Sequence, residues 1–253
     1  MAFVWFHRLG SPRHFYRLAR ALTPWLGGLA ALLLVAGTVW GLAIAPPDYQ
    51  QGDSYRIIFV HVPSAWMSMF AWVFMALCGL IVLVWRIKVA AALMRAAAPL
   101  GASFTFLALV TGSLWGKPMW GTYWVWDARL TSELILLFLY LGFIALQSAI
   151  EERDAAGRAG AVLALVGVVN IPIIHYSVEW WNTLHQGPTV TKFDQPSISL
   201  AMLLPLLTMA LAFMTYFAAV LLKRARCDIL EAEANSNWVR ERLATVQADP
   251  RDS

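Results

Sequence analysis

The sequence predicts an all-α integral membrane protein with six transmembrane helices, and three observations lead to this fold class. Hydrophobic residues make up 60% of the 253 positions and charged residues only 13%, about half the charged share of an average soluble domain. The mean hydropathy is +0.62. The apolar residues are gathered into six long runs. These features exclude a soluble enzyme, a disordered chain and a nucleic-acid-binding domain.

Each of the six runs is long enough to cross a hydrocarbon core of about 30 Å as a helix. Within the fourth run the one charged residue is Glu133, one turn from the start. We expect a single polytopic domain over residues 1–253, with a polar cytoplasmic tail at 228–253. The predicted spans are residues 24–45, 57–85, 96–115, 130–150, 159–178 and 197–222.

The distribution of basic residues predicts the orientation. Six spans place both termini on one side of the membrane, and that side carries fifteen Lys and Arg residues against four on the other. Because Lys and Arg collect on the cytoplasmic side, we expect both termini in the cytoplasm. The outer loops are then residues 46–56, 116–129 and 179–196. The basic N-terminal segment precedes a span-length apolar run, which indicates a retained helix rather than a signal peptide.

A tryptophan-rich segment, LWGKPMWGTYWVWDARL, follows the third span. It contains Trp115, Trp120, Trp124 and Trp126, followed by Asp127. An aromatic belt at the headgroup level is one interpretation, but belts usually place one or two aromatic residues at each helix end. Four tryptophans favour an outer-face platform for a large planar ligand. We expect Asp127 to orient this loop by accepting backbone or indole N–H hydrogen bonds.

Two histidines at the same predicted membrane edge indicate what the ligand is. His61 lies one turn into the second span, and His185 lies in the last outer loop. Two neutral imidazoles are the axial ligand set of a b-type haem, although a hydrogen-bonded interfacial role is the alternative for each. His175, in the outer half of the fifth span, competes with His185 for this role. The alternative role for His175 is a hydrogen bond to a neighbouring helix. We prefer His185 because it is nearer the level of His61.

Two arginines are candidates for contacts with the haem propionates. Arg56 precedes His61 at the same membrane edge, and Arg129 ends the tryptophan-rich segment. Guanidinium groups pair bidentately with carboxylates. The alternatives are snorkelling of Arg56 to the headgroups and a local ion pair of Arg129 with a neighbouring carboxylate. Lys117 and Lys192 are weaker candidates. The chain has no CxxCH motif, so covalent haem attachment to its own cysteines is excluded.

These residues point to a known family. The stretch WGKPMWGTYWVWDARLTSELILLFLYLG resembles the tryptophan-rich WGxxWxWD segment of the haem-handling proteins of cytochrome c biogenesis. Among them it is most similar to the cytochrome c maturation protein C (CcmC) family. The segments around the two histidines, PPDYQQGDSYRIIFVHVPSAW and NIPIIHYSVEWWNTLHQG, agree as well. The resemblance covers about residues 24–222.

The resemblance implies a haem site at the periplasmic face of the bacterial inner membrane. His61 and His185 match the axial ligands, and residues 115–127 match the platform. The implied partners are an ABC-type ATPase subunit, a membrane subunit, a small single-span subunit and a periplasmic haem chaperone that receives the haem. The resemblance implies a binding and transfer protein rather than an enzyme. The sequence has no GxxxxGK[ST] motif, so ATP hydrolysis is expected in a partner.

Two other functions remain open. A b-type cytochrome that passes electrons to quinone would bury its haem ligands inside the bundle and would hold a second haem, for which the chain offers no further histidine pair. A haem permease would need a polar path at mid-depth, with broken helices. Pro63, Pro99, Pro172 and Pro205 interrupt spans, but no charged residue lies at the predicted midplane.

Overall fold

The structure is a computed structural model that describes residues 10–185, 187 and 197–248. Lys192 lies outside the described residues. Within them, the chain is helical without a β-strand, and six helices are long and apolar enough to cross a membrane. The predicted fold class, an all-α protein with six membrane-spanning helices, is confirmed.

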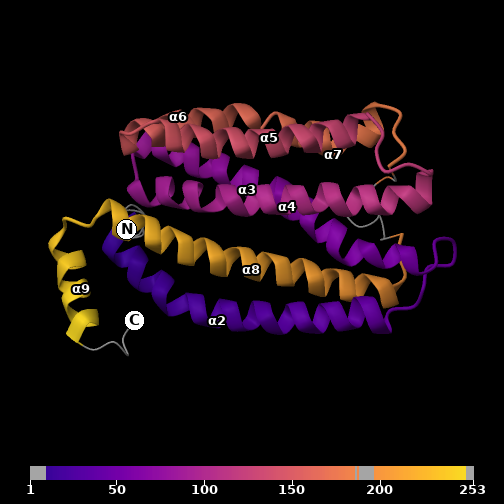
Figure 1. Ribbon diagram of the computed structural model, residues 1–253, viewed down its shortest axis with the longest axis horizontal. Helices are drawn as coiled ribbons and strands as arrows, with labels where there is room; N and C mark the ends of the chain where they lie inside the picture. The colour runs from indigo at the N-terminus through magenta and orange to yellow at the C-terminus, as the bar shows by residue number, and fades with distance from the viewer. Residues whose placement is uncertain (1–9, 186, 188–196, 249–253) are drawn as a thin grey trace, which may run out of the picture.

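The helices follow one another as an antiparallel bundle (Figure 1). The first is α2, which is continued by one π-helical turn at Trp40–Ile44, and a 3₁₀ turn at Asp53–Ile57 leads into α3. The bounds of the helices are α2 (Pro12–Val39), α3 (Ile58–Trp85), α4 (Lys88–Trp120), α5 (Ala128–Ala149), α6 (Arg153–Gly167), α7 (Asn170–Trp180), α8 (Leu200–Ala232) and α9 (Asn237–Ala248).

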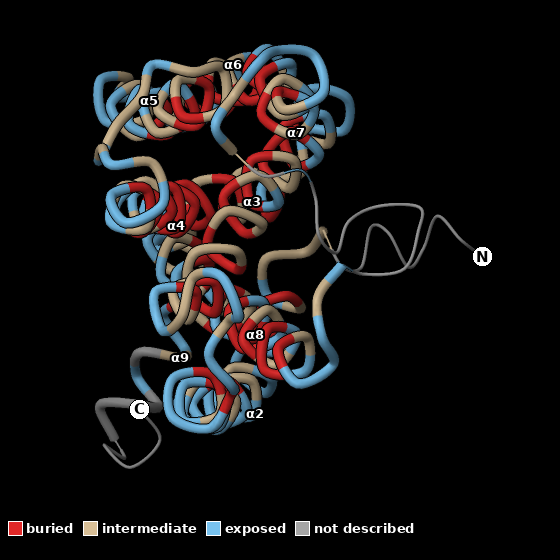
Figure 2. The backbone as a smooth tube through the Cα atoms, turned by 90° about the vertical axis from the view of Figure 1, so that its right-hand side faces the viewer, coloured by how far each residue is buried: buried red, intermediate tan, exposed pale blue. Residues whose placement is uncertain are grey.

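The spanning helices form three layers. Helices α5, α6 and α7 lie on one side, α3 and α4 form the middle layer, and α8 and α2 lie on the other side (Figures 1 and 2). The middle layer carries most of the core, since the most apolar windows of α3 and α4 are 50% and 56% buried. The corresponding window of the first span is only 17% buried. Helix α2 packs mainly on α8 and leaves most of its apolar surface exposed (Figure 2).

The fifth span is broken, which differs from the continuous run predicted at 159–178. Helix α6 ends at Gly167, and α7 begins at Asn170. Pro172 lies in the first turn of α7. Because proline has no backbone N–H, it cannot donate a hydrogen bond to the carbonyl of Val168. That carbonyl accepts a bond from the N–H of Ile171 instead (3.0 Å). The buried side-chain amide of Asn170 donates to the carbonyl of Ser132 (2.9 Å) and ties the break to α5.

The tryptophan-rich segment is more helical than the predicted loop at 116–129. Helix α4 continues to Trp120, so that Trp115 and Trp120 are helical residues. Gly121 then adopts a left-handed conformation (φ 75°), and its N–H donates to the carbonyl of Lys117 (3.1 Å). A glycine in this conformation is a common helix terminator. The loop between α4 and α5 is therefore only residues 121–127.

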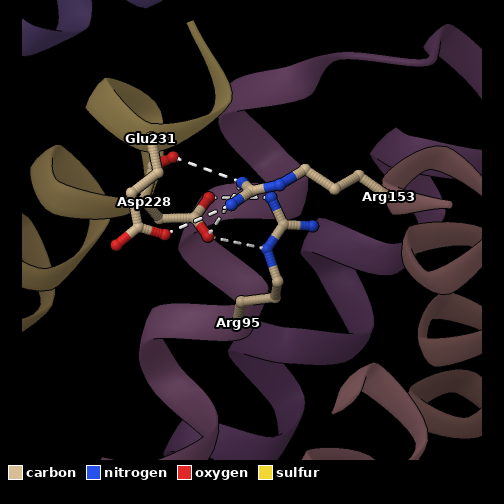
Figure 3. A network of polar contacts seen from close by, with 4 residues as sticks. All are labelled: Arg95, Arg153, Asp228 and Glu231. Atoms are coloured by element: carbon tan, nitrogen blue, oxygen red, sulfur yellow. Dashed lines mark hydrogen bonds and ion pairs between the residues drawn. The ribbon is translucent and has the colours of Figure 1, made fainter. Parts of the chain in front are cut away.

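An ionic network holds together the end of the bundle that lies opposite the loop between α4 and α5 (Figure 3). Arg95 of α4 donates two hydrogen bonds to the carboxylate of Asp228 on α8, at 3.0 and 2.7 Å. Arg153, at the start of α6, lies 3.6 Å from Asp228 and 3.2 Å from Glu231. Helix α8 runs to Ala232, so the first residues of the predicted polar tail belong to this helix. The network joins three helices at this end.

Candidate functional site

An open cavity lies at the end of the bundle opposite the ionic network. Its empty space of about 1020 Å³ includes space that is open to the outside. The start of α3, the last turns of α4, the start of α5 and the end of α7 surround it. Three histidines reach it from different segments, namely His61, His175 and His185, together with Arg129.

His61, in the first turn of α3, is held in one orientation by α4. Its Nδ1 lies 3.1 Å from the carbonyl of Ala108 and 3.0 Å from the hydroxyl of Thr111. Because a carbonyl only accepts, Nδ1 carries the proton of the neutral ring and donates it. The Thr111 hydroxyl donates to the carbonyl of Leu107 (2.6 Å) and can therefore accept from His61. Nε2 is left as the nitrogen that can bind a metal, the arrangement usual for metal-binding histidines.

His185 follows the end of α7, and its imidazole ring lies near that of His61. Its backbone N–H donates to the hydroxyl of Thr183 (2.8 Å), and its ring packs against Trp120 with 5.1 Å between centroids. Burial of the ring, together with the neighbouring His61 and the charge of Arg129, lowers the pKa of His185 to about 3. The imidazole is therefore neutral at pH 7, the form that binds a metal.

The spacing of the two imidazole rings is compatible with a shared metal ion. Their ring centroids lie 6.2 Å apart. A metal–imidazole bond is about 2 Å long, so two imidazoles that share one metal have centroids about 6 Å apart. Among the described residues, no group of three or more His, Cys, Asp and Glu side chains is arranged to hold a metal. His61 and His185 together offer two imidazole donors, a number that suits a metal whose other ligands come from a macrocycle such as haem.

Two of the four predicted platform tryptophans line the cavity. The ring of Trp115 lies 5.6 Å from that of His61. Its Nε1–H donates to the side-chain oxygen of Gln51 (2.9 Å), which fixes the indole. Trp120 lines the cavity beside His185. His61 and His185 therefore each have one tryptophan beside them, and both tryptophans come from the last turns of α4.

The remaining residues of the predicted platform lie outside the cavity lining. The rings of Trp124 and Trp126 contact each other, with 5.4 Å between their centroids, and Trp126 is 75% exposed. Asp127 begins α5, where its Oδ1 accepts a hydrogen bond from the N–H of Leu130 (2.8 Å). This is a backbone hydrogen bond of the kind expected for Asp127, and it orients the loop from the α5 side.

The two candidate arginines differ in position. Arg129 lines the cavity, and its guanidinium donates to the hydroxyl of Ser177 (3.0 Å) and to the carbonyl of His175 (2.9 Å). It thus joins α5 to the last turns of α7 instead of forming an ion pair with a neighbouring carboxylate. Arg56 is outside the lining. It pairs with the exposed carboxylate of Asp53 (2.8 Å) and donates to the carbonyl of Gly41 (3.1 Å).

Several lining residues carry no signal in the sequence. Trp66 and Met69 look like ordinary residues of an apolar span, and Met119 looks like a residue of the predicted loop, yet all three line the cavity. Gly112 faces it as well, and a Cβ atom at this position would lie 2.9 Å from Cε1 of His61. The absence of a side chain at Gly112 therefore allows the imidazole to lie against the backbone of α4.

The fold and the cavity define a class: a polytopic membrane protein with a histidine pair beside tryptophans in a cavity open at one end of the bundle. The chain belongs to the heme exporter protein C family (CcmC), whose model matches residues 5–240. It is 50% identical over 243 residues to heme exporter protein C of Haemophilus influenzae, covering 96% of this chain and 99% of the relative. It is 54% identical over 235 residues to that of Escherichia coli K12, covering 93% and 95%.

A more distant relative comes from a plant. The chain is 42% identical over 198 residues to a putative cytochrome c biosynthesis ccmC-like mitochondrial protein of Marchantia polymorpha, covering 78% of this chain and 82% of the relative.

Proposed function

We propose that this chain is a haem-handling membrane protein of c-type cytochrome biogenesis. It binds haem b non-covalently at the periplasmic face and presents it to a periplasmic haem chaperone. The observation that carries the proposal is the pair His61 and His185, 6.2 Å apart between ring centroids in an open cavity lined by tryptophan. The names of the relatives, which concern haem export and cytochrome c biosynthesis, support it.

The residues of the cavity hold haem in three ways. His61 and His185 would supply the two imidazole ligands of the haem iron. Trp115 and Trp120 cover the planar ring by apolar contact and stacking. The guanidinium of Arg129 supplies a positive charge at the cavity wall for a propionate, and it also donates a hydrogen bond to α7. Arg56 is less suited to this contact because Asp53 and Gly41 already occupy it.

The two histidines are held unequally, which suits a protein that must release its ligand. His61 is a helical residue with two hydrogen bonds to its Nδ1. His185 lies beyond the end of α7 and is fixed mainly by contacts with Trp120 and Thr183. Release at His185 would leave haem attached to the helical ligand while its outer face becomes accessible to the chaperone.

Exposed aromatic residues near the cavity provide a surface for the chaperone. Trp126 is 75% exposed, and Tyr123 and Trp180 are each 55% exposed. Aromatic side chains of this kind are enriched at protein interfaces. The loop that carries Trp124 and Trp126 would then contact the chaperone rather than the haem ring.

The proposal places the chain in the bacterial inner membrane with both termini in the cytoplasm. The cavity then faces the periplasm, and the network around Arg95 and Asp228 faces the cytoplasm. The partners are an ABC-type ATPase subunit, a membrane subunit and a small single-span subunit. Hydrolysis of ATP belongs to the ATPase subunit, and this chain has a binding and transfer role instead of an enzymatic one.

A haem permease is the second candidate, and the broken fifth span favours it. Interrupted helices mark the binding sites of many transporters. Asn170 lies at this break, and Glu133 is buried nearby on α5, where it accepts a hydrogen bond from the hydroxyl of Ser68 (2.7 Å). Uptake of haem into sealed vesicles that contain this chain alone would support the permease over the presenting role.

Absorption spectra of the purified protein test the proposed function. The wild type and the His61→Ala, His185→Ala and His175→Ala variants would be purified with native lipid and recorded oxidised and reduced. We expect bis-imidazole haem bands that are lost or shifted in the first two variants and retained in His175→Ala. A spectrum indifferent to both substitutions would refute the ligand assignment.

A further inference from the structure

A second open cavity, far from the histidines, lies between the start of α2 and helix α9. It encloses about 1110 Å³ of space open to the outside. Figure 1 shows α9 and the start of α2 at the same end of the bundle, opposite the loop between α4 and α5. We call this cavity the basic groove, since its charged lining residues are Arg13, Arg17, Arg20, Arg242 and Glu241.

The positive charge of the basic groove is concentrated on one face of α2. Arg13, Arg17 and Arg20 follow one another at helical spacings of four and three residues, which places them on the same face. Like charges at these spacings destabilise a helix. Arg13 and Arg17 are exposed, and neither forms an ion pair with another described residue. An anion in the groove would remove the repulsion between them.

Helix α9 forms the second wall and is fixed against α2 by aromatic packing. The rings of Trp238 and Tyr16 lie 5.6 Å apart between centroids, and Val239 is only 2% exposed. The guanidinium of Arg226, on α8, lies over the ring of Tyr16 at 5.2 Å. The groove is therefore bounded by packed side chains, and Arg226 lies against Tyr16, one of its lining residues.

The basic groove opens onto apolar surface where the first span begins. Pro24 is both a lining residue and the predicted start of this span. On the face of α2 that carries the arginines, the exposed positions continue along the span with Pro24, Gly28, Ala31 and Val35, and α2 is the least buried of the six candidate spans. A ligand that fits both parts has an anionic headgroup and an apolar tail.

We propose that the basic groove binds the headgroup of an anionic phospholipid, with its acyl chains along the exposed apolar face of α2. Arginine pairs with phosphate through two parallel hydrogen bonds. Basic clusters next to a membrane span are typical sites for anionic lipids. A soluble phosphate compound would use the same arginines, but it would gain nothing from the apolar surface of α2.

Lipid retention by the full-length protein tests this inference. We would compare the wild type with two variants, Arg13→Gln/Arg17→Gln and Lys223→Gln/Arg224→Gln. Each protein would be incubated in detergent micelles that contain phosphatidylglycerol and phosphatidylcholine, and the retained lipids would be counted by native mass spectrometry. Lys223 and Arg224 are exposed residues of α8 outside the groove, so the control loses the same charge. Each arginine next to an anionic surface changes affinity about fivefold, so we expect phosphatidylglycerol to bind about 25-fold more weakly to the first variant alone.

Three results would overturn the proposal. The wild type could show no preference for phosphatidylglycerol over phosphatidylcholine. The groove variant could retain as much phosphatidylglycerol as the control variant. Inorganic phosphate at equal concentration could displace the lipid, which would indicate a soluble phosphate ligand instead. Gel filtration of each variant checks that the exposed substitutions leave the fold intact.

Discussion

The imidazole rings of His61 and His185 lie 6.2 Å apart between centroids, although one belongs to the first turn of α3 and the other follows the end of α7. Trp115 packs beside the first ring and Trp120 beside the second. The pair is therefore assembled from three segments, with α4 supporting both histidines.

The hydroxyl of Thr111 is expected to fix the orientation of His61. Thr111→Val preserves the shape of the side chain but removes the group 3.0 Å from Nδ1. Loss of such a hydrogen bond to a metal-binding histidine lowers affinity about 10–100-fold. We expect haem affinity, measured by titration of the haem-free protein, to fall within this range.

The control for this change is Thr105→Val, which alters a buried threonine on the same helix whose hydroxyl bonds to the carbonyl of Gly101. Equal haem affinities of the two variants would contradict a specific role of Thr111.

Gly112 is expected to tolerate no side chain. In Gly112→Ala the new Cβ would lie 2.9 Å from Cε1 of His61, so the imidazole must move away from α4. We expect haem affinity to fall about tenfold or more, because the ligand loses its orientation, and the Soret band to shift. Gly142→Ala is the matched control, since nothing lies within 4 Å of its added Cβ. A wild-type spectrum for Gly112→Ala would show that the packing of His61 against α4 is unimportant for haem binding.

Asp127 is expected to stabilise the start of α5 through its Oδ1, which accepts from the N–H of Leu130. Asp127→Ala removes this cap and should lower the free energy of unfolding by about 1 kcal/mol. Asp127→Asn keeps an acceptor oxygen and should retain most of the stability. Thermal denaturation in detergent measures both variants. If Asn lowers the melting temperature as much as Ala, the negative charge rather than the cap is what matters.

The ionic network at the other end is expected to depend most on Asp228. This carboxylate serves two arginines, so Asp228→Ala leaves both without their shared partner. We expect it to destabilise the protein more than Arg95→Ala, for which hydrogen bonds between charged groups suggest a cost of about 2 kcal/mol.

A much smaller effect is expected for Arg153→Ala, because this side chain is 48% exposed and exposed pairs contribute little. Melting temperatures of the three variants check the order. An Arg153→Ala variant as unstable as Asp228→Ala would contradict it.

Much of this protein is determined by local properties of the sequence. Six apolar runs predict six spanning helices because the length and hydropathy of each run are properties of neighbouring residues. The residue types at His61, His185 and Trp115 predict a haem site for the same reason, since iron ligation and stacking depend on the chemistry of the side chains. The resemblance to the CcmC family also follows from residues that are contiguous in the chain, and the family model confirms it.

Other features were decided by the tertiary structure. Trp120 faces the cavity and Trp126 faces outward because α4 continues to Trp120 and ends at Gly121. Arg129 lines the cavity while Arg56 does not, because each guanidinium is directed by carbonyls of another helix. The basic groove exists only because α9 packs against α2. The first feature follows from where α4 ends. The other two depend on contacts between residues far apart in the sequence, which the pattern of any single segment does not contain.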